Sequence, residues 1–295
     1  MPTPFIYAIV VLIWGTAWYM IKFQLGIVAP EISLVYRFGI ATICVFIYAR
    51  LAGSPLGLSW RDHRYVALQG LTLFCLNYWM TYLSTQYLTS GLVAVIFTAI
   101  IFFNLVNSRL VFGTPVERRV LMAAGAGMLG VALLFMPELR AALDDPTIVH
   151  GALLALGAAY VASLGNLTAM RNTRGRLPVV TVNAYGLAYG TISLAAIAIL
   201  RGTPIAFDPR WPYVLSLLYL SLVGTSLAFG LYLALIKRIG AARAAYTTVL
   251  IPVVALVVST LFEGYDWSPS AIAALAVLLA GNALALGGGA RKTER

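Results

Sequence analysis

The side chains that could bind a small molecule in this sequence are aromatic, hydroxyl-bearing or amide-bearing, and they lie within apolar runs. Tyr78 and Tyr82 are four residues apart, so they share one face of a helix. A neutral, aromatic lining suits amphipathic organic solutes better than bare ions. An interfacial aromatic belt or plain helix packing would use the same residue types. We interpret eight residues as candidate substrate-binding positions: Trp14, Asn77, Tyr78, Tyr82, Thr98, Tyr160, Ser163 and Tyr246.

Arg37 lies about two turns into an apolar run that begins near residue 31. A long basic side chain there could reach out to the membrane interface, and this is the simpler interpretation. The functional alternative is a fixed positive charge that attracts a substrate carboxylate or closes an outer gate. The sequence leaves both interpretations of Arg37 open.

Catalytic and metal-binding patterns are absent from the sequence. His63 and His150 are far apart, and no metal-ligand spacing or phosphate-binding glycine loop is present. Cys44 and Cys75 both lie within apolar runs, so they indicate neither a disulfide framework nor a metal site. We therefore predict no cofactor, no metal and no enzymatic activity.

The composition of this chain indicates that much of it is embedded in lipid. Of 295 residues, 61% are hydrophobic and 10% are charged, with a mean hydropathy of +0.90. Soluble domains carry about 25% charged residues. The net charge of +10 could suggest nucleic acid, but the basic residues occur in small groups between apolar runs, as membrane topology produces. We predict an all-α integral membrane protein with no nucleic-acid partner.

Ten apolar runs are long enough to cross a bilayer as helices, which needs about 20 residues each. Pro252 lies inside the ninth run and should act as a hinge, because proline frees a backbone carbonyl. Ile101 stands at the corresponding position of the fourth run, so we expect the fourth helix to be straighter than the ninth. The predicted spans are 4–22, 31–50, 64–84, 88–111, 117–136, 149–170, 178–200, 211–235, 241–262 and 269–288.

The predicted spans divide the loops between the two sides of the membrane, and lysine and arginine are concentrated on one of them. With the N-terminus inside, 15 basic residues fall on inner loops and the C-terminal tail, whereas four fall outside: Lys22, Arg140, Arg201 and Arg210. Basic residues gather on the cytoplasmic side of membrane proteins. The asymmetry predicts a multi-pass protein of the cell membrane with both termini in the cytoplasm.

The acidic residues all fall near predicted loops or helix ends. A proton-coupled transporter usually keeps a carboxylate near the middle of the membrane. Glu31 and Glu263, at helix termini, come nearest to that position. We expect every carboxylate to be solvated and the transport of substrate to need no proton.

An offset of 151 residues aligns the two halves of the chain. It places Gly130-Val131-Ala132-Leu133 on Gly281-Asn282-Ala283-Leu284 without a gap. Five helices in the first half force the second half to enter the membrane from the opposite face. We predict one membrane domain with a first repeat at 1–137, an inverted second repeat at 148–290 and a cytoplasmic tail at 291–295.

Several short motifs resemble the drug/metabolite transporter superfamily in its ten-helix EamA-type branch. They include Trp14-Gly15-Thr16-Ala17-Trp18, Tyr36-Arg37-Phe38, Tyr87-Leu88-Thr89-Ser90-Gly91-Leu92 and Arg238-Ile239-Gly240-Ala241-Ala242-Arg243-Ala244, then Pro252 and Glu263-Gly264-Tyr265. The resemblance covers essentially the whole chain and is greatest to the YddG group. It implies export of aromatic amino acids and related metabolites.

We therefore expect a secondary transporter of small organic metabolites, with aromatic and other apolar amino acids as substrates, working by alternating access. Its partners would be the small-molecule substrate and the lipid bilayer, with no obligate protein partner. A nucleotide-sugar or lipid-precursor carrier of the same superfamily is the alternative within transport. A membrane-embedded enzyme and a structural or assembly factor are alternatives from other classes.

Overall fold

The protein is described by a computed structural model. It covers residues 1–113, 146–174, 177–244 and 247–286, together with 118, 121–122, 125–126, 129–130 and 133. Every regular element in the described part is helical. In chain order these are α1 (Thr3–Met20), η1 (Ile21–Gln24), α2 (Pro30–Leu51), α3 (Trp60–Gln69), η2 (Gly70–Leu76), α4 (Asn77–Ser84), α5 (Ser90–Phe97), α6 (Ile100–Phe112), α8 (Thr147–Arg174), α9 (Val179–Leu200), α10 (Trp211–Leu218), η3 (Tyr219–Leu227), α11 (Ala228–Ala244), α12 (Thr247–Phe262) and α13 (Pro269–Leu286).

Six helices are long and apolar enough to cross a membrane, and each coincides with a span predicted from the sequence. The prediction of an all-helical membrane protein is therefore confirmed for these spans. Their bounds are Thr3–Gln24, Pro30–Leu51, Ser90–Phe112, Thr147–Thr173, Val179–Leu200 and Trp211–Tyr232.

The remaining predicted spans differ in how they are formed. The third, 64–84, lies in the continuous helical run α3–η2–α4, and the tenth, 269–288, corresponds to α13. The ninth was expected to begin at 241, but α11 continues to Ala244 and α12 begins at Thr247. The fifth, 117–136, falls largely outside the described residues.

Two helical runs contain a π-helical segment, and the segments occupy related positions. In η2 and η3 the helix widens between regular α-helices. Shifting η2 by the 151-residue offset places it on residues 221–227, within η3. Segments of this kind are frequent at functional sites. Both also adjoin the cavity described below.

The fourth span is interrupted, contrary to the expectation that it would be straighter than the ninth. A turn at Thr98 and Ala99 separates α5 from α6, with Thr98 N–H bonding to Val95 O and Ala99 N–H to Ile96 O. The Thr98 hydroxyl also donates to Val95 O at 2.6 Å, which competes with the regular helical pattern. By contrast, α12 continues through Pro252. The expectation is therefore wrong.

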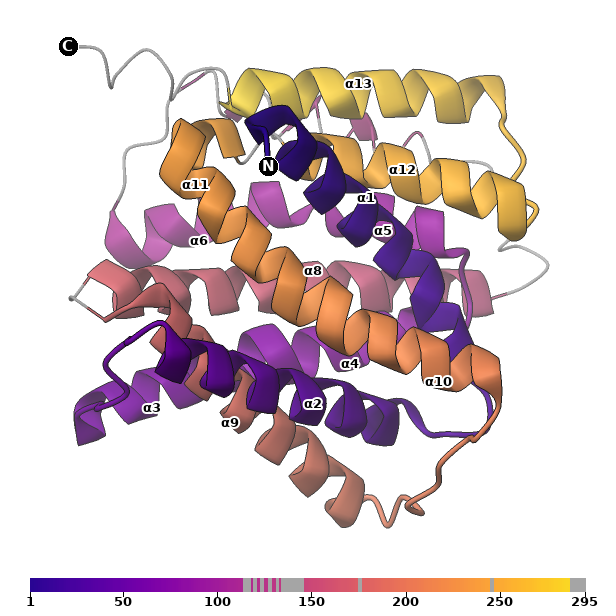
Figure 1. Cartoon of the computed structure of the whole chain (residues 1–295). Helices are drawn as coiled ribbons and strands as arrows, with labels where there is room; N and C mark the ends of the chain where they lie inside the picture. The colour runs from indigo at the N-terminus through magenta and orange to yellow at the C-terminus, as the bar shows by residue number, and fades with distance from the viewer. Residues whose placement is uncertain are drawn as a thin grey trace.

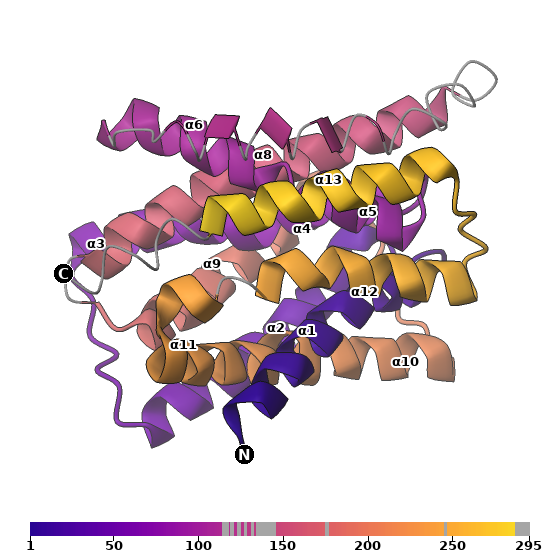
Figure 2. The ribbon, with the colours of Figure 1, turned by 90° about the horizontal axis from the view of Figure 1, so that it is seen from above.

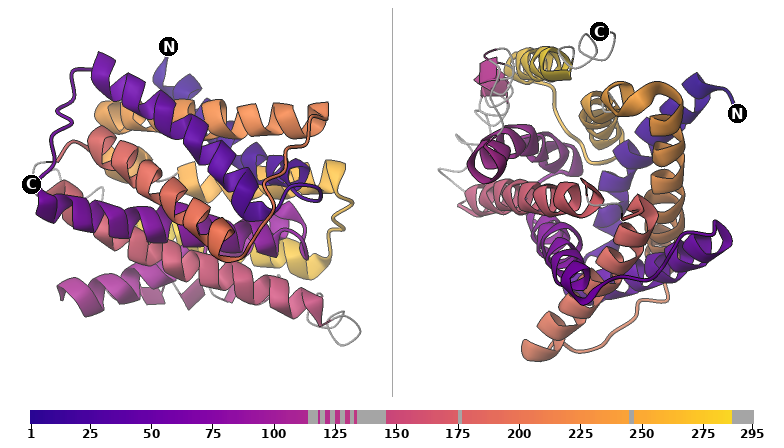
Figure 3. Two further views of the ribbon diagram at one scale, coloured as in Figure 1. Left: turned by 90° about the horizontal axis from the view of Figure 1, so that it is seen from below. Right: turned by 90° about the vertical axis from the view of Figure 1, so that its left-hand side faces the viewer.

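The helices form one bundle in which most elements run in similar directions, while α1, α9 and α10–α11 cross them obliquely (Figure 1). Segments from both halves of the chain contact each other, including α1 with α11 and α12, and α2 with α9. Seen from above, α13 lies beside α12 (Figure 2). In the right-hand view of Figure 3, many helices are seen along their axes.

Glycine permits two of the close helix contacts. A Cβ on Gly15 of α1 would lie 2.4 Å from Val254 Cγ1 of α12. A Cβ on Gly70 of η2 would lie 2.6 Å from the Gly186 carbonyl oxygen of α9. Both distances are far below van der Waals contact, so these helices approach only because no side chain intervenes.

The two ends of the bundle are named after Lys22 and Tyr185. At the Lys22 end, α1 gives way to η1, α2, α5 and α10 begin, and α9 and α12 finish. At the opposite, Tyr185 end, α2 finishes and α9 begins. There Tyr185 Oη donates to Leu56 O and Tyr189 Oη lies 2.9 Å from His63 Nδ1.

Candidate functional site

A cavity of about 400 Å³ lies among the helices of both halves. Its volume falls within the range of about 300–1,000 Å³ that small-ligand sites occupy. Arg37 is the single charged side chain in the described lining. The lining residues are Trp14, Ala17, Trp18, Ile21, Arg37, Asn77, Tyr78, Thr81, Ala94, Phe97, Thr98, Ile100, Ile101, Asn104, Asn166, Gly224, Phe229, Thr248, Ile251 and Pro252.

Trp14 is held against the cavity wall by the π-helical segment η3. Its Nε1 donates to Gly224 O at 3.2 Å, and its ring contacts Phe229 edge-on with centroids 5.8 Å apart. A widened helix exposes carbonyls that a regular helix would use internally. Trp18, one turn further along α1, faces Phe97 with centroids 5.5 Å apart. Aromatic rings therefore form part of the apolar lining of the cavity.

Arg37 is buried, with 3% of its surface exposed, so it does not reach the membrane interface as the simpler sequence interpretation expected. Its Nη1 donates to Tyr82 Oη at 3.2 Å, and its guanidinium lies 4.9 Å from the Tyr78 ring centroid. The Tyr82 hydroxyl thus accepts a hydrogen bond from Arg37.

The guanidinium of Arg37 has no carboxylate partner among the described residues. The ion pairs in the described part of the chain all involve other cations. Its Nε is buried without a hydrogen-bond acceptor. The one acid on α2, Glu31, is already engaged by Thr203, Arg201 and Trp79. A buried arginine without a counter-charge is costly inside a membrane, which marks Arg37 as a functional candidate.

The helix α4 contributes Asn77, Tyr78 and Thr81 to the cavity. Asn77 is 4% exposed, its Nδ2 donates to Leu73 O at 3.0 Å, and its Oδ1 is buried without a partner. The Thr81 hydroxyl donates a hydrogen bond to Asn77 O at 2.9 Å. Asn77 directly follows the π-helical segment η2, so a widened helix adjoins the cavity here as it does at Gly224.

The remaining polar groups lie across α6, α8 and α12. Asn166 Nδ2 lies 3.4 Å from Asn104 Oδ1, which joins α8 to α6 at the cavity wall. Thr98 lines the cavity at the interruption between α5 and α6. Pro252 lines it from inside α12, where a proline has no backbone N–H to donate to the helix.

The structure brings together six of the ten residues singled out from the sequence and leaves three elsewhere. Tyr82 is fully buried behind the lining and contacts the cavity only through Arg37. Tyr160 is 44% exposed and packs on Phe103, and Ser163 accepts a hydrogen bond from Asn107 that joins α6 to α8. Tyr246 lies outside the described residues. The six that line the cavity are Trp14, Arg37, Asn77, Tyr78, Thr98 and Pro252.

Several lining residues were not singled out from the sequence. Thr81 lies one turn beyond Asn77, so its helical spacing could have revealed it. Phe97 shares its predicted span with Phe102 and Phe103, Phe229 lies in another long apolar run, and no spacing distinguishes either from residues that face lipid. Only the contacts of these rings with Trp18 and Trp14 show that they face the interior.

Glu263 joins three elements at the Lys22 end of the bundle. It accepts hydrogen bonds from the backbone N–H and hydroxyl of Ser90 at the start of α5, and from Ser259 Oγ at 2.5 Å. Its Oε1 lies 3.5 Å from Lys22 Nζ, which also donates to Leu88 O at 2.7 Å. A carboxylate at the N-terminus of a helix is favourably placed.

Glu31 forms a second junction at the same end. Its Oε1 accepts from Thr203 Oγ1 at 2.7 Å and lies 3.3 Å from Arg201 Nε, while its Oε2 faces Trp79 Nε1 at 3.3 Å. Glu31 is 4% exposed, and the side chain of Glu263 is 9% exposed. The expectation that every carboxylate is solvated is therefore wrong, because position near a helix end does not reveal what packs over it.

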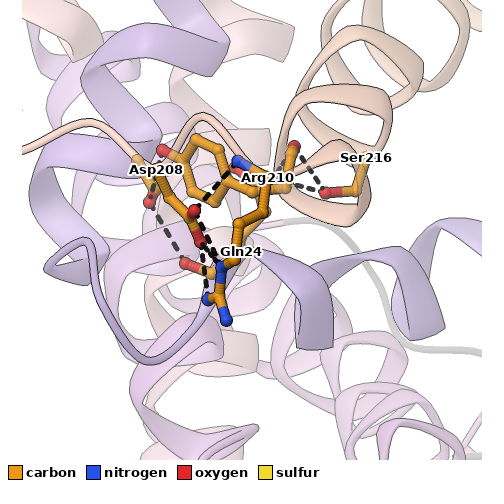
Figure 4. A network of polar contacts seen from close by, with 6 residues as sticks. Gln24, Asp208, Arg210 and Ser216 are labelled. Atoms are coloured by element: carbon orange, nitrogen blue, oxygen red, sulfur yellow. Dashed lines mark hydrogen bonds and ion pairs between the residues drawn. The ribbon is translucent and has the colours of Figure 1, made fainter.

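A third polar network connects η1 to the start of α10 (Figure 4). Gln24 Nε2 donates to Ser216 Oγ at 2.6 Å and to Tyr213 O at 3.0 Å. Beside it, Asp208 and Arg210 pair at 2.7 Å in the loop before α10. The hydrogen bond from Arg210 lowers the pKa of the Asp208 carboxyl below its ordinary 3.8. Three separate networks thus join helices at the Lys22 end.

Relatives with curated names span nearly the whole chain. An uncharacterised transporter, YvbV of Bacillus subtilis, is 27% identical over 94% of this chain and 89% of its own length. A probable amino-acid metabolite efflux pump of Salmonella typhimurium is 24% identical over 94% and 92%. An uncharacterised inner membrane transporter, YedA of Escherichia coli, is 26% identical over 91% and 85%. A solved crystal structure shares the fold with a TM-score of 0.67 at 18% identity, over 96% of each chain.

The six membrane-length helices and these relatives define the class of protein: a multi-pass membrane transporter of small molecules. The EamA-like transporter family matches residues 3–136 and 149–287. The chain belongs to this family, which is part of the drug/metabolite transporter superfamily.

Proposed function

We propose that this chain transports amino acids with aromatic and other apolar side chains across the cell membrane by alternating access. The observation that carries the proposal is the central cavity. In its described lining it combines aromatic rings at Trp14, Trp18 and Phe97 with uncharged polar groups and a single cation, Arg37. Such a lining complements a solute with an apolar side chain and a small charged end. The name of the Salmonella typhimurium relative, an amino-acid metabolite efflux pump, supports this substrate class.

Two inverted halves would supply the two states that alternating access needs. The matching positions of η2 and η3 at the 151-residue offset support a repeat, as do the two segments that the family matches. We propose ten helices, with repeats at 1–137 and 148–290. The networks around Glu263 and Glu31 would then form the gate that closes the Lys22 end.

The proposed orientation places both termini in the cytoplasm. Lys22, Arg201 and Arg210 lie at the Lys22 end, whereas the Tyr185 end carries Arg50, Arg61, Arg171 and Arg174. Because basic residues favour the cytoplasmic side, the Lys22 end would face outward. Export in the manner of the YddG group, which the sequence resembles, would proceed toward that end.

A nucleotide-sugar or lipid-precursor carrier receives less support. Such a substrate carries one or more phosphates, for which a larger and more basic cavity would be expected. The described lining contains Arg37 as its single charged side chain in a volume of about 400 Å³. The cavity therefore supports amino acids over this alternative.

Uptake into proteoliposomes tests the proposal. Vesicles containing the purified protein and preloaded with unlabelled L-phenylalanine should exchange it for external labelled L-phenylalanine, and L-leucine and L-tryptophan should compete. Protein-free vesicles measure passive leak. The absence of exchange above that leak for every amino acid in a broad panel would contradict the proposed function.

A further inference from the structure

Two residues that line the cavity each carry a buried polar atom with no partner among the described residues, one a donor and the other an acceptor. Arg37 Nε is a donor without an acceptor, and Asn77 Oδ1 is an acceptor without a donor. Both residues line the cavity and both are at least nine-tenths buried, at 3% and 4% exposed. An unsatisfied buried polar group destabilises the protein, so each has a reason to bind a ligand.

The assignment of the free atom on Asn77 follows from its other hydrogen bond. The amide faces Leu73 O at 3.0 Å, and a carbonyl oxygen can only accept. The atom directed at Leu73 is therefore Nδ2, which leaves Oδ1 as the free atom. An acceptor in this position suits a cationic donor such as an ammonium group.

Arg37 is held ready to bind an anion. Its Nη1 is fixed by Tyr82 Oη, and its guanidinium packs against the rings of Phe38 and Tyr78 at 5.2 Å and 4.9 Å. These contacts fix the orientation of the guanidinium without neutralising its charge. A planar guanidinium matches the geometry of a carboxylate. The missing counter-charge is one that a substrate can bring.

We propose that Arg37 and Asn77 together recognise the zwitterionic end of an amino acid, with the carboxylate at Arg37 and the protonated amine at Asn77 Oδ1. The inference rests on the proposed function and specifies its substrate: a free α-carboxylate and a free α-ammonium are both required. The aromatic rings of Trp14, Trp18 and Phe97 then receive the side chain. Because the cavity supplies one cation and no carboxylate in its described lining, acidic and basic side chains have no counter-charge there.

Binding of matched analogues to the purified protein in nanodiscs tests this recognition. L-Phenylalaninamide lacks the carboxylate and N-acetyl-L-phenylalanine lacks the ammonium, while both keep the aromatic ring. Each should bind at least about tenfold more weakly than L-phenylalanine, since a hydrogen bond to a charged group is lost. If L-phenylalanine binds but either analogue binds equally well, the inference fails while the proposed function stands.

Substitutions assign each end of the substrate to its residue. In Arg37→Gln the preference for L-phenylalanine over its amide should disappear, while the preference over the N-acetyl compound remains. Asn77→Leu should show the reverse pattern. A purely structural role would weaken all three ligands together and leave both preferences intact, which would overturn the assignment. Should Arg37→Gln fail to fold, Arg37→Lys keeps the charge, and its preference over the amide should persist.

If none of the three ligands, nor L-leucine or L-tryptophan, binds or is transported by the unmodified protein, the proposed function itself is contradicted. The two failures are therefore distinguishable. The inference fails, and the proposed function stands, when amino acids bind and their modified forms bind equally well.

Discussion

Lys22 Nζ lies 3.5 Å from Glu263 Oε1, and this ion pair joins the end of the first membrane helix to the end of α12. The same carboxylate accepts hydrogen bonds from Ser90 at the start of α5. A single side chain thus connects three helices that all contribute residues to the cavity or lead into it. The connection lies at one end of the bundle, where the proposed gate would close.

Replacing Glu263 by glutamine should weaken this closure. Glutamine keeps the shape of the side chain but loses the negative charge, which Lys22 and the Ser90 N–H bind. A hydrogen bond to a charged group contributes about 1.5–3 kcal/mol to stability. A cysteine at Thr98 should then react at least about tenfold faster with an impermeant thiol reagent added from the Lys22 side. Asp266→Asn, an exposed acid three residues away, is the matched control and should leave the rate unchanged. Equal rates in both variants would argue against a gate at Glu263.

Tyr78→Ala should reduce transport with little loss of folded protein. The ring lines the cavity, packs edge-on against Phe38 at 4.8 Å and lies beside the Arg37 guanidinium. Removing it takes away both substrate contact and support for Arg37, so exchange of labelled L-phenylalanine should fall at least about tenfold. Tyr160→Ala removes a tyrosine that is 44% exposed and outside the cavity, and it should transport normally. Unchanged flux in Tyr78→Ala for every substrate would refute a cavity role for this residue.

Cysteine labelling tests the topology. Trp60 and Ile205 are 79% and 84% exposed and lie near opposite ends of the bundle. In a variant without Cys44 and Cys75, Trp60→Cys in whole cells should be protected from an impermeant reagent. Ile205→Cys should be labelled from outside. The opposite pattern would reverse the proposed orientation, and labelling of both from outside would contradict the helix arrangement between them.

Transport should need no proton gradient. The described cavity lining contains no carboxylate, and the acids Glu31 and Glu263 serve junctions at the Lys22 end. Proteoliposomes should therefore equilibrate labelled substrate at equal internal and external pH. A pH gradient alone should not raise the internal concentration above the external one. Uphill accumulation that collapses with a protonophore would show coupling and direct attention to those two acids.

The sequence predicts the membrane helices well because their signal is local. Apolar length alone locates α2 and α9 to within a residue or two of their ends. It does not predict the interruption at Thr98, where a side-chain hydroxyl competes for a backbone carbonyl. It also gives no sign of η2 and η3, since apolar composition is the same in α- and π-helical backbone.

The cavity is only partly predictable for a related reason. Tyr78 and Asn77 stand out because polar and aromatic groups are unusual deep in an apolar run. Whether such a group faces the interior depends on the rotation of its helix, which tertiary packing decides. Tyr160 and Trp14 are both aromatic residues within predicted spans. Tyr160 packs on Phe103 at the surface, whereas Trp14 donates a hydrogen bond to Gly224 O at the cavity.

The central claim is that amino acids pass through the cavity beside Thr98, and substrate protection tests it most directly. In a variant without native cysteines that carries Thr98→Cys and still transports, the alkylation rate is measured with and without saturating L-phenylalanine. Alkylation should abolish exchange, and L-phenylalanine should slow alkylation at least about tenfold by occupying the site. L-Phenylalanine that is transported but leaves the alkylation rate unchanged, or full exchange after complete alkylation, would contradict the claim.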